Sequence, residues 1–154
     1  MRSASARAGR ARNSQQQAIA ALQDALAAEQ AAGYGYGVVG AHLPQGSAKQ
    51  GAATADWIAH LRVTDELIGM ISARGGEPAP AAVAYQLPEH VQTVAAAVAL
   101  AVLLEDRVAQ AYLAVVALPD SGLRRFDAQQ VRAAALRAAA WRGSTQAFPG
   151  LPAT

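Results

Sequence analysis

Apolar residues recur every three or four positions between residues 14 and 43, which is the spacing that lines side chains along one face of a helix. The carboxylate of Glu29 lies in the middle of this apolar face. Burying a carboxylate without a partner costs several kcal/mol, so the fold must bring Glu29 a hydrogen-bond donor or a cation. The positions that form the face are Ile19, Leu22, Leu26, Glu29, Gly33, Tyr36, Gly40 and Leu43.

The same periodicity predicts a second helix that begins between residues 47 and 54 and ends at the glycine pair of residues 75–76. His60 borders the apolar face of this helix, where a histidine more often has a hydrogen-bonded structural role than a metal or catalytic one. The predicted face consists of Trp57, Leu61, Thr64, Ile68 and Ile71.

A third helix is predicted over residues 91–118, and Glu105 interrupts its apolar face just as Glu29 interrupts that of the first helix. When Glu29 is aligned with Glu105, Tyr36 matches Tyr112. The first and third helices are therefore either two copies of one pattern or alike by chance.

The segment at residues 77–89 is too rich in proline for a helix and too apolar for a free linker, so we expect it to lie extended along the protein. A fourth helix follows over residues 123–141. Four long helices with one long connection predict an all-α, ferritin-like four-helix bundle with a crossover between the second and third helices. The bundle is expected to occupy residues 14–154, after a disordered basic tail at residues 1–13.

The composition agrees with a helical chain, because alanine is the main contributor to an apolar share of 53% and aromatic residues are few. The absence of cysteine excludes disulfides, thiolate metal sites and cysteine nucleophiles. Four of the thirteen basic residues precede the first acid, Asp24, so the remaining nine basic and eleven acidic residues give a net charge of −2. A basic nucleic-acid-binding face on the bundle is therefore not expected.

Ferritin-like carboxylate proteins bind two metal ions with one glutamate from each of two helices and a Glu-x-x-His pair from each of the other two. Glu29 and Glu105 fit the two single-glutamate positions. The second helix, however, has Trp57-x-x-His60, and the fourth has no acid or histidine after Asp127. At most half of a di-metal site remains.

We therefore interpret five residues as a buried polar network or vestigial metal site: Glu29, His60, Glu105, Tyr36 and Tyr112. The alternative is a metal-binding or oxidase-like protein that uses Glu29, Glu105 and His60. No catalytic residue is assigned and no cofactor is expected, whereas the alternative would use iron or manganese. If neither a metal nor an arginine neutralises the two glutamates, replacing both with glutamine should not lower the stability.

Five segments are distinctive when taken together, and with them the chain resembles the actinobacterial ferritin-like domain family of unknown function, DUF4439, over roughly residues 17–152. The resemblance implies a ferritin-like bundle and no established activity. The segments are AEQAAGYGYGVVGAHL, AHLRVTDELIGMI, PAPAAVAYQLP, LLEDRVAQAYLAVV and AAAWRGSTQAFPGLP. The chain departs from the family pattern at Gln30, where the family has a histidine, and this departure further weakens a metal interpretation.

The expected protein is thus an uncharacterised ferritin-like bundle that is not an enzyme. Alanine-rich residues 133–140 offer a surface for a second copy, so we expect a homodimer. The longest apolar run, residues 94–104, is too short to cross a bilayer, so we expect no membrane partner and a cytoplasmic location. Nucleic acid is not expected as a partner either, although the basic tail leaves that alternative open.

Overall fold

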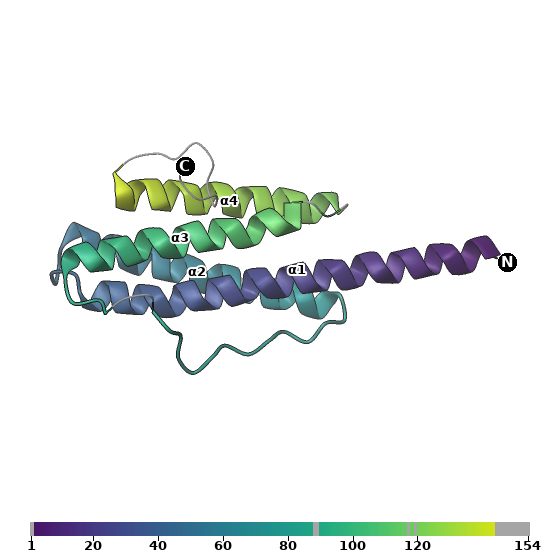
Figure 1. The fold of residues 1–154 in the computed structure, drawn as a ribbon, viewed down its shortest axis with the longest axis horizontal. Coiled ribbons are helices and arrows are strands. Elements are labelled where there is room, and N and C mark those ends of the chain that lie inside the picture. The colour runs from purple at the N-terminus through teal and green to yellow at the C-terminus, as the bar shows by residue number, and fades with distance from the viewer. Residues whose placement is uncertain (1, 88–89, 117, 119, 144–154) are drawn as a thin grey trace.

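Four long helices make up the computed structural model, which describes residues 2–87, 90–116, 118 and 120–143. They are α1 (Arg2–Ala41), α2 (Ala48–Ala73), α3 (Val94–Val116) and α4 (Ser121–Arg142). Helix α1 packs against both α2 and α3, and α3 packs against α4 (Figure 1). The predicted all-α bundle is confirmed.

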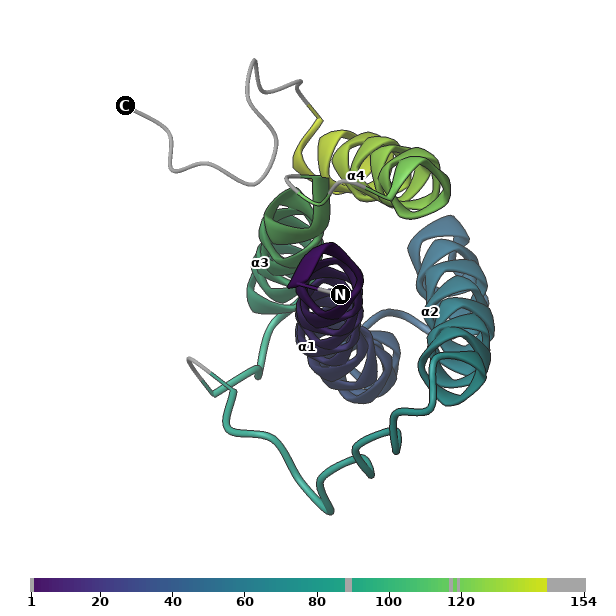
Figure 2. The same cartoon turned by 90° about the vertical axis from the view of Figure 1, so that its right-hand side faces the viewer.

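The connections give the bundle its ferritin-like chain order. Short connections join α1 to α2 and α3 to α4, so each pair is a helical hairpin, and the long segment between α2 and α3 returns along the bundle. As a result α1 and α3 run in opposite directions. Figure 2 shows the four helices end-on, with the crossover outside them.

Local capping explains where α2 and α4 begin and end. The Ser47 side chain accepts a hydrogen bond from the amide of Gln50 at the start of α2, and Asp120 does the same for two amides at the start of α4. Gly75 and Gly143 follow the helix ends with positive φ angles of 76° and 77°. The predicted start and end of α2 are confirmed, whereas Pro119 and the closing segment at residues 148–152 lie outside the described residues.

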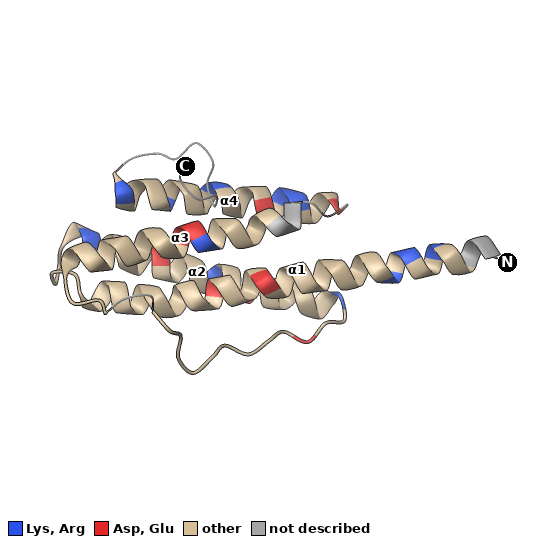
Figure 3. Ribbon diagram, in the orientation of Figure 1, with Lys and Arg blue, Asp and Glu red and all other residues tan. Residues whose placement is uncertain are grey.

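Helix α1 begins at Arg2, not at residue 14, where the apolar pattern of the sequence begins. Residues 2–13 contain no proline and several good helix formers, so nothing in this stretch stops the helix. This part of α1 extends beyond the other helices and carries basic residues (Figure 3), and the side chains of residues 5–17 are exposed. That the tail is disordered in solution stays a prediction.

The crossover lies along α1, as predicted, and glutamine side chains hold it there. Gln23 donates to the carbonyl of Glu77 at 2.6 Å and accepts from the amide of Ala79 at 3.0 Å. Gln30 donates to the carbonyl of Ala79 at 3.0 Å. The glutamine that stands where a family histidine was expected therefore fastens the crossover to the outer side of α1.

The core consists of two apolar clusters that follow one another along the bundle. One includes Leu22, Leu26, Leu67, Ile71, Val108 and Tyr112. The other includes Tyr36, Val39, Leu100, Leu104 and Trp141. Along α3 the boundary between the clusters falls at Glu105, because residues 97–104 belong to the second cluster and residues 108–112 to the first. Along α1 the boundary falls between residues 32 and 36, just after Glu29.

The predicted inner face of α2 is wrong over much of its length. Trp57, Leu61 and Ile68 are 40%, 41% and 37% exposed. The buried residues of this helix are Ala53, His60, Leu67 and Ile71. Helix α2 is therefore rotated about its axis relative to the prediction, and His60 points into the centre of the bundle. Burial of His60 is favoured because two carboxylates inside the bundle need donors.

Candidate functional site

A polar layer separates the two apolar clusters and receives one residue from each helix. Glu29 of α1, His60 of α2 and Glu105 of α3 are 1%, 1% and 0% exposed. Arg137 of α4 completes the layer with a side chain that is 18% exposed. The three residues expected from the sequence are thus brought together, and a fourth joins them.

The imidazole of His60 bridges the two glutamates. Its Nδ1 atom lies 2.5 Å from Oε2 of Glu29, and its Nε2 atom lies 3.0 Å from Oε1 of Glu105. An ionised carboxylate accepts hydrogen bonds but donates none, so each ring nitrogen needs a proton to complete its bond. The geometry therefore fits a doubly protonated, positively charged histidine.

The two tyrosines hold the glutamates reciprocally. Tyr36 of α1 donates to Oε1 of Glu105 on α3 at 2.7 Å, and Tyr112 of α3 donates to Oε1 of Glu29 on α1 at 2.7 Å. Both helices carry a tyrosine seven residues after the glutamate, and they run in opposite directions. Each tyrosine therefore faces the glutamate of the other helix.

Arg137 is the site residue for which the sequence analysis named no position. Its Nε atom donates to Oε1 of Glu105 at 2.8 Å, so this oxygen accepts hydrogen bonds from Tyr36, His60 and Arg137. With His60 protonated, two cations face two glutamates, and the charges of the layer balance without a metal ion.

The repeat already noted between α1 and α3 extends to the cations. His60 follows Glu29 by 31 residues, and Arg137 follows Glu105 by 32. Each hairpin thus contributes a glutamate, a tyrosine and then a cation at nearly the same spacing. Without a gap, however, the alignment of Glu29 with Glu105 places Leu136 opposite His60, so the alignment alone does not single out Arg137.

The surroundings shift the pKa values of the layer toward its charged form. Burial alone would lower the pKa of His60, but the hydrogen bonds to Glu105 and Glu29 outweigh it and raise the pKa to about 9. Burial would raise the pKa of Glu105, yet hydrogen bonding and attraction to His60 and Arg137 lower it below its ordinary value. Burial raises the pKa of both tyrosine hydroxyls, Tyr36 and Tyr112, which therefore remain donors.

Two aspartates lie near the layer without joining it. Asp56 of α2 accepts a hydrogen bond from the indole nitrogen of Trp141 on α4 at 2.8 Å, and burial raises the pKa of its carboxyl group. Asp127 of α4 is fully buried, and neither carboxyl oxygen has a partner among the described residues. Burial, with a smaller contribution from Asp120, raises the pKa of Asp127 to about 7.

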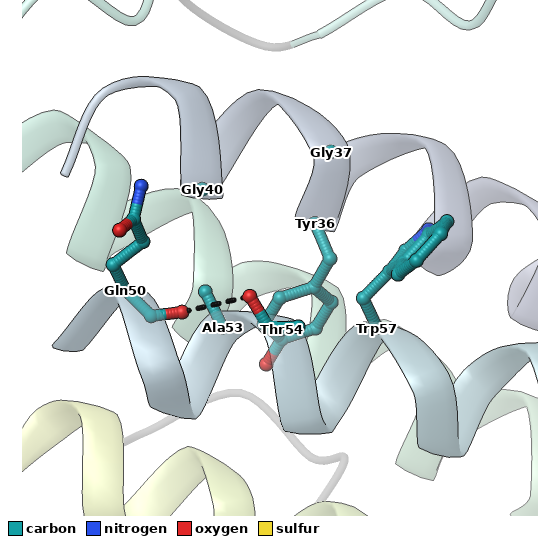
Figure 4. Close-up of a pocket in the computed structure, with 7 residues that line it drawn as sticks. All are labelled: Tyr36, Gly37, Gly40, Gln50, Ala53, Thr54 and Trp57. Carbon is teal, nitrogen blue, oxygen red and sulfur yellow. Dashed lines mark hydrogen bonds between the residues drawn. The ribbon is translucent and has the colours of Figure 1, made fainter. Parts of the chain in front are cut away.

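A small hollow lies between α1 and α2 beside the polar layer (Figure 4). It has a volume of about 240 Å³ and is bordered by the rings of Tyr36 and Trp57. Gly37 and Gly40 open it from the side of α1, because no atom lies within 4 Å of where their Cβ atoms would be. The hollow reaches the ring of Tyr36, whose hydroxyl group belongs to the layer.

The residues of the layer do not fit the pair of metal ions that ferritin-like carboxylate proteins hold. Both nitrogens of His60 are engaged by carboxylates, and Arg137 places a positive charge beside Glu105. Oε2 of Glu105 is a buried oxygen with no partner among the described residues, but a metal ion needs several such oxygens. Within the described ranges, no group of three or more His, Asp or Glu residues is arranged to hold a metal ion.

Comparisons with known proteins agree with the fold and name no activity. A family model described as a domain of unknown function, DUF4439, matches residues 21–153. The crystal structure of a conserved hypothetical protein, Rv2844 from Mycobacterium tuberculosis, is similar with a TM-score of 0.78 and 37% identity, covering 83% of this chain and 96% of that one. Among curated proteins there is no significant match. None of the described helices has the length and apolar character needed to cross a membrane.

Proposed function

The chain belongs to the DUF4439 family of domains of unknown function, and we propose that it is a non-catalytic ferritin-like bundle held together at its centre by a metal-independent ion-pair network. The observation that carries the proposal is the charge balance of the polar layer. His60 and Arg137 supply two positive charges to Glu29 and Glu105, one from each of the two remaining helices.

The residues of the network lie on the bundle helices where a ferritin-like protein carries its metal ligands, but the histidine and arginine among them donate protons instead of lone pairs. A histidine that binds a metal offers a lone pair, whereas His60 offers a proton from each ring nitrogen. An arginine stays protonated in proteins, so Arg137 cannot become a ligand. Protein cations take the place that metal ions have in related bundles, and the site then orients four helices instead of activating a substrate.

Metal analysis tests this function. Protein purified without chelator and then loaded with iron or manganese should retain no stoichiometric metal after desalting. Glu29→Ala should give the same result as wild type and as the control Glu66→Ala, which removes an exposed acid of α2. Stoichiometric metal that is lost in Glu29→Ala and kept in Glu66→Ala would overturn the proposal.

A metal-binding or oxidase-like protein that uses Glu29, Glu105 and His60 is the second candidate. The observation that favours it is the Oε2 atom of Glu105 in the centre of the bundle, which has no hydrogen-bond partner within the part of the chain that the structure describes. Binding there would require His60 to lose a proton, so metal uptake would release protons and strengthen as pH rises. Titration calorimetry in buffers of different ionisation enthalpy measures that release, and its absence rejects this candidate.

The proposed homodimer and cytoplasmic location rest on the sequence. The alanine-rich stretch at residues 133–140 lies within α4, where exposed positions alternate with buried ones. A second copy would use half-buried positions of this stretch such as Ala135 and Ala139, which the polar layer does not need.

A further inference from the structure

A groove runs between the first half of α2 and the last half of α4, with a volume of about 400 Å³. Its walls are apolar and consist largely of alanine side chains, among them Ala52 and Ala140. Leu136 lies at the groove with 62% of its surface exposed. The groove thus suits the hydrocarbon part of a small molecule.

Arg137 links this groove to the polar layer. Its Nε atom bonds Glu105 inside the bundle, while the residue also lines the groove. A guanidinium has five N–H donors, and the four on the terminal nitrogens have no hydrogen-bond partner among the described residues. These donors form the planar fork that matches a carboxylate.

Two other charged side chains line the groove, one of each sign. Lys49 adds a second positive charge on the α2 side. Asp56 also lines the groove, but its carboxylate already accepts the indole N–H of Trp141. Lys49 offsets the charge of Asp56, so the preference for a carboxylate comes from the N–H donors of Arg137 that the polar layer leaves unused.

We propose that this groove binds a small monocarboxylate with a short hydrocarbon tail. The carboxylate pairs with the terminal nitrogens of Arg137 and with Lys49, and the tail lies against Ala52, Ala140 and Leu136. The site goes beyond the proposed structural role of the network, because it uses the face of Arg137 that the network leaves free.

Hexanoate is the probe for this site, and the indole N–H signal of Trp141 is the readout. The chain has two tryptophans, so Trp57→Phe leaves a single indole signal in a proton–nitrogen NMR spectrum. Hexanoate should shift this signal in a saturable manner at millimolar concentration. Hexylamine and 1-hexanol, which share the tail but lack the carboxylate, should not.

Filling the groove gives the matched control. Ala52 lines the groove and Ala55 does not, yet both are exposed residues of α2. Ala52→Leu should weaken hexanoate binding by about tenfold or more, and Ala55→Leu should leave it unchanged. Equal binding of the three probes, no saturable shift, or hexanoate binding that survives Ala52→Leu would each overturn the proposal. None of these results depends on metal content, so this proposal and the proposed function fail separately.

Discussion

Glu105 is the residue on which the donors of the polar layer converge. One oxygen accepts from a tyrosine, a histidine and an arginine that come from three different helices. Charge-assisted hydrogen bonds of this kind are roughly twice as strong as neutral ones. Removing one partner, however, leaves the other charge buried and unpaired, which destabilises the folded protein. The layer should therefore respond to mutation as a unit.

Replacing both glutamates with glutamine, Glu29→Gln with Glu105→Gln, should now destabilise the protein. The sequence analysis expected no loss only if no arginine neutralised the pair, and Arg137 does so. The variant leaves a partly buried guanidinium without its anion, which costs about 3–5 kcal/mol when one partner of a buried ion pair is removed. Urea unfolding at neutral pH measures this loss.

Adding Arg137→Met to that variant should recover most of the lost stability, because the stranded charge is then gone. Arg132→Met, which removes an exposed arginine of the same helix, is the control and should recover none. A double glutamine variant as stable as wild type would show that the charges contribute nothing.

The pH dependence of stability should report the proton on His60. Its pKa is raised from 6.5 to about 9 by folding, so the stabilisation is complete below pH 6.5 and is lost as pH rises through 9. The loss amounts to roughly 3 kcal/mol at about 1.4 kcal/mol per pKa unit. Urea unfolding of wild type and His60→Gln between pH 6 and pH 10 isolates this effect, since the other titrating groups are shared. A stability difference that stays constant across this range would contradict it.

Helix α1 uses its different faces for different neighbours. Glu29 and Tyr36 face the centre, while Gln23 and Gln30 hold the crossover. Of the three glycines at positions 33, 35 and 37, Gly35 makes the close approach to α3, where an added Cβ would lie 2.6 Å from Leu104.

Gly35→Ala and Gly37→Ala should therefore have opposite effects. Alanine favours a helix by about 1 kcal/mol over glycine. At Gly37 no atom lies within 4 Å of the new Cβ, so the variant should gain up to that amount. At Gly35 Leu104 must move, and overpacking of a core costs about 1–3 kcal/mol. Thermal unfolding of the two variants measures these stability changes. Equal changes would mean that Leu104 moves away from the new Cβ at Gly35 without a cost in stability.

At the scale of the whole molecule, two hairpins of similar design close on each other. Each supplies a glutamate, a tyrosine and a cation. Each tyrosine bonds the glutamate of the other hairpin, and His60 reaches Glu105 of the other hairpin as well, whereas Arg137 bonds Glu105 of its own hairpin. The polar layer therefore ties α1 and α2 to α3 and α4, which the short connections alone do not do. The long crossover then only connects the end of α2 with the start of α3 at the opposite end of the bundle.

The whole chain should be a homodimer in solution. Light scattering coupled to size exclusion at tens of micromolar should give twice the chain mass of 15.8 kDa. Ala135→Glu places a charge on α4 outside the ligand groove and should shift the protein toward monomer, whereas Leu113→Glu on α3 should not. A monomeric wild type at that concentration would contradict the prediction.

The sequence by itself determined the four helices, the crossover and the two glutamates in the apolar faces. These features are local, because helical periodicity, prolines and capping residues act within a few positions of the chain. The Glu-to-Tyr spacing shared by the first and third helices was visible for the same reason.

Tertiary structure alone decided which face of α2 turns inward and which cation reaches Glu105. Periodicity shows which residues share a face, but Trp57, Leu61 and Ile68 form as apolar a stripe as the buried residues do. Arg137 lies on a helix rich in arginine, and only the packing of α4 against α3 singles out the one whose long side chain meets a buried carboxylate. Which residue pairs with a buried charge depends on where the helices place the side chains in space, and the spacing of residues along one helix does not determine this.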